Sequence, residues 1–408
     1  MGRKSHTRRA TGGGPSLTRQ EALVTPAVLQ WARESGNLDL VTAAQKLSVS
    51  VERLHQWEAG ERRPTLRQAR RAAEVYKRPF SSFFLPVAPP TEPLPRDFRR
   101  LPNEEPAPVS PALRLELRRA LFRRRVALEL TPPDGIPAAG FVGSASLTDD
   151  PGQVAGRART LLGVSLESQR AFRDRYVALN AWKDRLESLG ILVFHFSGVA
   201  VEDARGFSLG DIPLPVIGVN GGDSPKGRIF TLVHEFAHLL VGVTGSCALQ
   251  EEHLPAADRL TEVFCNAVAG NVLVPSGALL DEPLVAAHGP SPTWSDEDLH
   301  ELANEYQVSR EVILRRLLSL QRTTVEFYRA ERELLNRPPE LGGGGPIPIP
   351  RRVIRAVGQR FARSVIDAYD REAITSADVS EYLGTRLKHL SAIRNLLDGP
   401  NLLTGGDR

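Results

Sequence analysis

The first part of the chain alternates short hydrophobic segments with turn residues. Between Leu23 and Leu85, apolar positions recur at the helical spacing of three and four residues in successive segments. These segments are residues 25–35, 39–47, 50–58, 66–77 and 79–85. The second and third segments flank a short turn at residues 48–50, as the two helices of a helix-turn-helix do. The pattern therefore predicts an all-α helix-turn-helix domain over residues 21–86.

The middle of the chain mixes helical patterns with strand patterns. Residues 113–130 and 166–190 have the apolar periodicity of amphipathic helices. Residues 191–197 and 214–220 are short runs rich in β-branched residues, which favour strands. Residues 230–242 are almost entirely apolar without alternation, so we expect a buried helix of about three turns there. These patterns predict an α+β block with helices, a small sheet and a buried helix.

Two stretches rich in proline and glycine divide the chain. Prolines recur through residues 87–111 and prevent a continuous helix, and residues 337–349 combine four glycines with further prolines. We therefore expect an α+β multidomain protein. Its expected parts are a disordered basic tail (1–20), the helix-turn-helix domain (21–86), a Pro-rich linker (87–111), the central α+β domain (112–336), a Gly/Pro linker (337–349) and a small helical C-terminal region (350–408).

Composition narrows the class of protein. The chain has 408 residues, of which 41% are hydrophobic and 25% charged, as in soluble globular proteins. No apolar run is long enough for a membrane helix, and the basic start lacks the apolar region of a secretory signal. The cysteines are Cys247 and Cys265 alone, so we expect no disulfide framework and a cytoplasmic location. The net charge of +4 permits contact with nucleic acid without arguing for it.

Three polar residues interrupt the apolar segment 230–242. His234 and His238 are four residues apart, so on a helix both imidazoles lie on one face and can bind one Zn²⁺. Glu235 is rotated by roughly 100° from His234, which keeps it out of the ligand set but within reach of a water on the metal. This is the HExxH arrangement of two ligands and a general base. The alternative is a core helix whose histidines bond to the backbone, but two histidines flanking a glutamate favour a metal site.

A hydrolytic zinc site needs a third protein ligand and one open position. The extended motif HExxHxxGxxH is excluded, because Val241 and Thr244 stand at its glycine and histidine positions. The remaining candidates for the third ligand are Glu251, Glu252, His253, Asp258, Glu262 and His288. The first three lie in a polar stretch before a proline, which is typical of a solvated loop.

Glu262 is the favoured third ligand. It lies in a helical pattern of apolar residues, Leu260 and Val263 among them, that predicts an otherwise buried helix. An acidic residue aimed into such surroundings is expected to have a partner. Asn266, one turn further on, would orient a ligand histidine from behind. Cys265 is interpreted as a small buried thiol.

This set of residues predicts hydrolysis of a peptide bond. One zinc ion per chain, bound by two imidazoles and one carboxylate, would acidify a water and polarise the scissile carbonyl, with Mn²⁺ as the alternative ion. Glu235 would take the proton of that water and return it to the leaving amine. The oxyanion that develops also needs a hydrogen-bond donor. The candidates for this donor are His253, His288 and Tyr306.

Two stretches of the chain resemble a known family. GRIFTLVHEFAHLLVG (227–242) followed by RLTEVFCNAVAGNVLVP (259–275) is similar to the zinc-binding motifs of the ImmA/IrrE family of bacterial and phage zinc peptidases. The resemblance extends over about residues 190–320, and it implies a zincin-like peptidase domain. The residues it implies are His234, His238 and Glu262 as zinc ligands and Glu235 as the catalytic acid/base.

The chain departs from the family pattern at three positions. Phe236 and Ala237 replace a more usual small or aliphatic pair, and Gly270 stands where a bulkier residue is common. These departures bear on the shape of the substrate pocket and leave the metal ligands in place.

The first domain also resembles a known class. WEAGERRPT (57–65) is similar to the end of the recognition helix in XRE/Cro-type DNA-binding domains. Ser50, Arg53 and Gln56 would face outward from that helix and contact DNA, since Arg and Gln read base edges in the major groove. Glu52 would repel phosphate, so the alternative is a domain that binds protein or only packs.

Together the two resemblances imply a function. We expect a zinc metallopeptidase with a DNA-binding-type N-terminal domain and no membrane partner. The implied substrate is a DNA-binding repressor or antitoxin, cleaved to control transcription in stress response, mobile-element induction or a toxin–antitoxin system. We interpret the helical C-terminal region, 350–408, as a docking or regulatory segment. The alternatives are a transcriptional regulator or antitoxin that uses the zinc-site fold as a sensor without proteolysis, and an interaction protein without metal.

Overall fold

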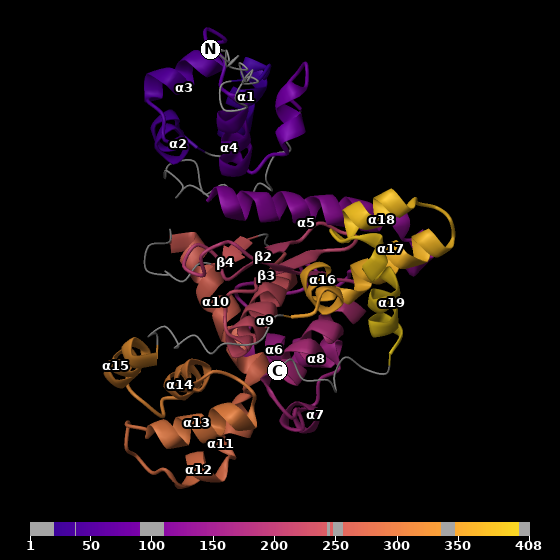
Figure 1. Ribbon diagram of the computed structural model, residues 1–408. Coiled ribbons are helices and arrows are strands. Elements are labelled where there is room, and N and C mark those ends of the chain that lie inside the picture. Colours follow the sequence, from indigo (N-terminus) through magenta and orange to yellow (C-terminus); the bar gives the residue numbers. More distant parts are fainter. Residues whose placement is uncertain are drawn as a thin grey trace, which may run out of the picture. The chain divides into compact units, whose positions relative to one another are not determined.

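The computed structural model describes residues 20–36, 38–89, 110–242, 245–247, 256–335 and 347–399 (Figure 1). Contacts divide them into two compact units. The first unit holds residues 20–89 and 110–115, and the second unit holds the described residues from 116 onward.

The first unit contains a bundle of short helices. Its elements are α1 (Pro26–Ser35), α2 (Leu40–Leu47), α3 (Val51–Glu58), α4 (Leu66–Tyr76) and the 3-10 helix η1 (Phe80–Phe84). The helices α2, α3 and α4 each begin at a capping side chain, Asp39, Ser50 and Thr65, that accepts a backbone N–H three residues on. A buried ion pair between Arg33 and Glu58, 2.8 Å long, connects α1 to α3. The helices agree with the hydrophobic segments, and the unit is the expected all-α helix-turn-helix domain.

The second unit contains a small four-stranded sheet. Its strands are β1 (Leu192–Phe196), β2 (Gly206–Leu209), β3 (Val216–Asn220) and β4 (Gly245–Cys247), in the order β1-β3-β2-β4. β1 pairs with β3 in parallel, whereas β2 pairs with β3 and β4 in antiparallel fashion. β1 and β3 are the two strands that the sequence predicts, and β2 and β4 are additional. Every residue of β1, β2 and β3 is buried, which explains why β1 and β3 do not alternate apolar with polar residues.

Helices make up most of the second unit. In chain order they are α5 (Pro111–Leu130, whose first turn belongs to the first unit), α6 (Pro151–Leu162), α7 (Leu166–Arg170), α8 (Arg175–Ser188), α9 (Pro225–Val241), α10 (Ala256–Leu273), α11 (Ser276–Leu280), α12 (Pro283–Ala287), α13 (Asp296–Glu305), α14 (Arg310–Ser319) and α15 (Val325–Leu335). The prediction of one helix over 166–190 is wrong, because Asp174 accepts the N–H groups of Tyr176 and Val177 and so starts α8 as a separate helix. Among the described residues, no helix combines the length and apolarity that crossing a bilayer requires.

The helices α9 and α10 pack against each other in the core (Figure 1). α9 begins at its capping residue Ser224, with Pro225 at its first position, and its 17 residues exceed the three turns expected from the apolar segment. It also packs against β2, β3 and α8, while α10 packs against α6. The prediction that α10 is buried is wrong at Leu260 and Val263, which are 67% and 52% exposed. α10 therefore has one face toward solvent and another, which carries Glu262, toward α9.

The C-terminal helices belong to the same unit as the sheet. They are α16 (Ile349–Val357), α17 (Gln359–Asp370), α18 (Ser376–Tyr382) and α19 (Leu390–Asp398). α16 packs against β1, and Arg355 Nη2 donates to the carbonyl of Gly221 at 3.3 Å. Between α16 and α17, Gly358 has a φ of +81°, and a Cβ there would lie 2.6 Å from the carbonyl oxygen of Val193 in β1. Only glycine fits at this junction.

Candidate metal centre

The fold brings three metal-ligand side chains to one point. His234 and His238, one turn apart on α9, direct their Nε2 atoms at the carboxylate of Glu262 on α10. The two Nε2 atoms are 3.0 Å apart. Glu262 Oε2 lies 3.1 Å from His234 Nε2, and Oε1 lies 3.2 Å from His238 Nε2. The structure thus places Glu262, the favoured third ligand, against the histidine pair.

The spacing of these atoms fits a tetrahedral metal ion. Zn²⁺ bonds of about 2.0–2.1 Å at tetrahedral angles separate neighbouring ligand atoms by about 3.3–3.4 Å. The three observed distances come within a few tenths of an ångström of that value. His234, His238 and Glu262 are at most 9% exposed, so solvent does not compete for the ligand atoms. Two imidazoles and one carboxylate also form a donor set that zinc prefers.

The charges within the cluster favour an ionised carboxylate. Burial by itself raises the pKa of Glu262, but hydrogen bonds with His234 and His238 outweigh it and hold the pKa of this carboxyl well below its usual range. Burial lowers the pKa of His238, whereas the Cys265 thiol and Glu262 raise this pKa by more. Without a metal the cluster binds protons, and a divalent cation would replace them.

Glu235 is buried beside the cluster on the same helix. Its side chain lies against the backbone of β2, since a Cβ at Gly206 would be 3.0 Å from Glu235 Oε1. Neither carboxylate oxygen has a well-formed hydrogen bond within the described residues. Burial raises the pKa of Glu235. The two histidines and, to a smaller extent, the Ser208 hydroxyl lower this pKa, but burial outweighs them. A buried carboxylate without a well-formed hydrogen bond is costly, which is typical of a group retained for its chemistry.

The other residues considered as third ligand or as oxyanion donor are not part of the ligand cluster of the described residues. Tyr306 is buried, and its hydroxyl donates to Glu282 at 2.6 Å, so this hydroxyl is committed to a partner within the protein. The ring of His288 stacks on Trp294 with centroids 3.6 Å apart, and His288 is not a member of the ligand cluster. Outside the described residues or side chains lie Glu251, Glu252, His253 and Asp258.

Two residues that contact the site were not identified from the sequence. Phe230 stacks on His234 with ring centroids 6.0 Å apart and an interplanar angle of 29°, so it restrains the imidazole. Its position one turn before His234 on α9 is a signal that helical spacing could have supplied. Gly206 has no such signal, because strand pairing in the folded sheet brings it to Glu235.

The three positions at which the chain departs from the family pattern lie in different parts of the structure. Phe236 and Ala237 are 1% exposed and belong to the core, where Phe236 packs on Phe141 with centroids 5.6 Å apart. They affect packing beneath α9 and do not contribute ligand atoms. Asn266 is buried on α10 one turn after Glu262, and its role in orienting a ligand histidine stays a prediction. Gly270 is on the same helix and lines a cavity described below.

The predicted DNA-contacting residues lie at the start and along the length of α3. Ser50 caps this helix, with its hydroxyl accepting the N–H of Arg53 at 3.1 Å. The side chain of Arg53 is exposed, and Gln56 is half-buried. Their contact with DNA stays a prediction.

Two segments of the chain match known family models. Residues 186–318 match the IrrE N-terminal-like domain, a metallopeptidase-type family whose members depend on zinc. This range contains the strands β1–β3 and the entire ligand cluster. Residues 29–83 match the helix-turn-helix family and cover α2, α3 and α4. No curated protein matches the chain.

Proposed function

We propose that the chain is a zinc peptidase that cleaves a DNA-binding repressor or antitoxin, because residues 186–318 match the IrrE N-terminal-like family and residues 29–83 match the helix-turn-helix family. The observation that carries the proposal is the meeting of His234, His238 and Glu262 beside a buried Glu235. Cleavage would change transcription in stress response, mobile-element induction or a toxin–antitoxin system. The helix-turn-helix domain would place the peptidase on the operator or on the repressor itself.

Each side chain of the site has a distinct role in this proposal. His234, His238 and Glu262 would hold the ion, and bound zinc supplies a polarised carbonyl and a water acidic enough to attack it at neutral pH. Glu235 accepts the proton of the attacking water, and the same carboxyl then protonates the leaving amine. Gly206 packs against this carboxylate and limits its movement, which keeps it close to the reacting water.

The test mixes the zinc-loaded chain with the repressor or antitoxin encoded by the adjacent gene and identifies new N-termini by mass spectrometry. The matched control is Glu235→Gln, which keeps the size of the side chain and all three ligands but removes the base. We expect cleavage at defined bonds by the original chain. We expect a loss of about 100-fold or more in the variant, with equal zinc content in both.

The outcomes of this test separate the peptidase from the alternative function. Cleavage by the original chain alone supports the proposal and identifies the substrate. If neither protein cleaves, and both change expression from the target promoter equally while they retain zinc, the chain is a metal-dependent regulator and the peptidase proposal is wrong.

A further inference from the structure

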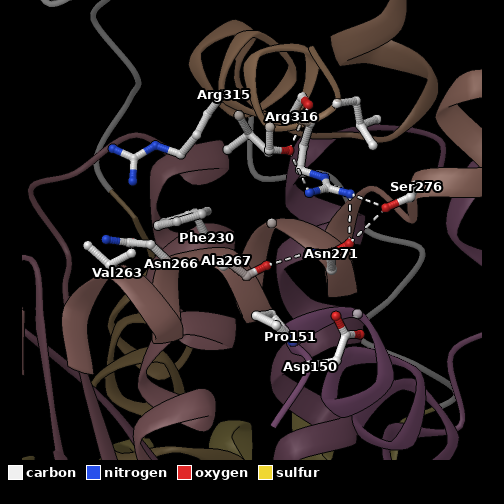
Figure 2. Close-up of a pocket in the computed structure, with 15 residues that line it drawn as sticks. Asp150, Pro151, Phe230, Val263, Asn266, Ala267, Asn271, Ser276, Arg315 and Arg316 are labelled. Atoms are coloured by element: carbon white, nitrogen blue, oxygen red, sulfur yellow. Dashed lines mark hydrogen bonds between the residues drawn. The ribbon is translucent and has the colours of Figure 1, made fainter. Parts of the chain in front are cut away.

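A cavity of about 440 Å³, whose lining residues are drawn in Figure 2, lies beside the metal cluster, since Phe230 in its wall stacks on His234. Its walls come from α10, α14, α11 and the start of α6, and Phe230 of α9 contributes from the side of the cluster. The volume falls within the range of about 300–1,000 Å³ that is typical of ligand pockets. It is large enough for one long or aromatic side chain of a bound peptide.

The cavity and the metal cluster share a wall. Phe230 lines the cavity and also stacks on the ligand His234. Val263 and Asn266, which line the cavity as well, stand next to Glu262 in the chain and one helical turn after it. Val263 is half-exposed, so the cavity opens to solvent near the metal end. A peptide whose scissile bond lies at the cluster would therefore have an adjacent side chain at this opening.

The accessible cavity wall is mainly apolar, and the donors of its buried arginine are bonded to neighbouring groups of the protein. Arg316 donates through Nε to the carbonyl of Val274 and through Nη1 to Ser319. Its Nη2 donates to Asn271 and Ser276, each at 2.7 Å, as Figure 2 shows. The polar end of the side chain is thus held by neutral acceptors. The apolar lining residues are Pro151, Phe230, Val263, Ala267, Val312 and Leu320.

Gly270 lets the arginine lie flat on α10. A Cβ at Gly270 would be 3.0 Å from Arg316 Cδ, so the methylene stem of Arg316 packs directly on the glycine. One of the three positions at which the chain departs from the family pattern therefore shapes this cavity.

The charges in the cavity wall oppose a basic ligand. No carboxylate among the described residues forms an ion pair with Arg316, and burial lowers its pKa only to about 10, so it is a cation at neutral pH. Asp150 is the acidic lining residue, and its carboxylate accepts the N–H of Gln153 as the cap of α6. An approaching lysine or arginine side chain would meet the like charge of Arg316 in the cavity wall, while Asp150 is exposed and already accepts the cap hydrogen bond of α6.

We infer that this cavity is a specificity pocket that accepts a large apolar side chain, such as Phe, Leu or Met, from the substrate residue beside the scissile bond, and that it rejects Lys and Arg. The inference rests on the proposed peptidase function for its location beside the scissile bond. The selectivity itself follows from the cavity wall.

The test measures binding and cleavage separately. The probes are fluorescein-labelled decapeptides of Gly, Ser and Ala that differ only at one central residue, which is Phe, Ala, Glu or Lys. Binding is measured by fluorescence anisotropy to the zinc-loaded Glu235→Gln protein, which lacks the base. We expect the Phe peptide to bind about tenfold more tightly than the Ala peptide, because an aromatic side chain buries a large apolar area. The Lys peptide should bind most weakly.

Two matched variants locate the binding site. Ala267→Phe places a ring in the cavity and should abolish the preference for Phe over Ala. Ala286→Phe makes the same change at an exposed position of α12 outside the cavity and should leave the preference intact. Equal zinc content in all variants shows that the metal cluster is unaffected.

The outcomes distinguish failure of the pocket from failure of the peptidase. Equal binding of the Phe and Ala peptides, tightest binding of the Glu or Lys peptide, or an Ala267→Phe variant that keeps the preference would each overturn the pocket, even if the original chain cleaves its substrate. A preference for Phe that Ala267→Phe removes supports the pocket, even if no peptide is cleaved.

Discussion

Gly206 offers the sharpest structural test of how Glu235 is positioned. It lies at the start of β2, and a Cβ at this residue would be 2.4 Å from Thr231 Cγ2 of α9 and 3.0 Å from Glu235 Oε1. The backbone oxygen of Gly218, on β3, would also be only 3.0 Å away. Carbon atoms in ordinary contact are about 3.5–4.0 Å apart. Gly206→Ala therefore forces α9 and β2 apart by about 1 Å.

This displacement has a cost in both stability and activity. An additional methyl group in a well-packed core costs about 1–3 kcal/mol. At roughly 2–4 °C per kcal/mol for a large domain, the thermal midpoint of the second unit should fall by about 2–12 °C. If Glu235 is the general base of the proposed peptidase, a shift of about 1 Å in its position should reduce peptide cleavage by about 100-fold. Differential scanning calorimetry and the cleavage assay measure the two effects on the same preparations.

Two further variants make the reasoning refutable. Thr231→Ser removes the methyl group that the new Cβ would strike, so it should restore part of the midpoint in the Gly206→Ala background. Gly156→Ala, on α6 with no atom within 4 Å of the new Cβ, should be neutral or stabilise by up to about 1 kcal/mol. An unchanged midpoint for Gly206→Ala, or a double variant no more stable than the single one, would show that β2 does not confine Glu235 as described.

Other predictions concern the C-terminal helices, a buried carboxyl and the first domain. Gly358→Ala should lower the thermal midpoint of the second unit by several degrees and speed proteolysis of the C-terminal helices, because its backbone conformation excludes a side chain. Burial raises the pKa of Glu187 to about 7. Since the folded state binds this proton more tightly than the unfolded state, stability should decline as pH rises from about 4.5 through about 7. Glu187→Gln should make that decline shallower in urea unfolding followed across this pH range. Arg53→Ala and Gln56→Ala should each weaken operator binding by about 1–3 kcal/mol in gel-shift titrations at fixed salt, and unchanged affinity would favour a protein-binding role.

Local signals in the sequence predict some elements well. The helices of the first unit were predicted within a residue or two, because Asp39, Ser50 and Thr65 cap them next to clear helical patterns. The histidine spacing on α9 likewise places two candidate ligands by helical geometry alone. The break before α8 also has a local signal, the cap Asp174, but the continuous apolar pattern obscured it.

Features that depend on tertiary contacts were not predictable in the same way. The four residues of β2 alternate over only two periods, which is too short a run to identify a strand, and pairing with β3 and β4 determines that they form one. Leu260 and Val263 follow the apolar pattern of α10, yet both are exposed, and Val263 instead borders the cavity. The proximity of Glu262 to the histidines was inferred from its apolar surroundings, and its distances depend on the packing of α10 against α9.

The measurement that tests the central claim most directly is the zinc content of the purified chain and of its His238→Ala variant, determined by elemental mass spectrometry after dialysis against a weak chelator. Two imidazoles and one carboxylate at mutual distances of 3.0–3.2 Å should retain one zinc ion per chain, and loss of one imidazole should reduce the content to a small fraction. Absence of zinc from both proteins, or equal zinc in both, would contradict a metal centre built from His234, His238 and Glu262.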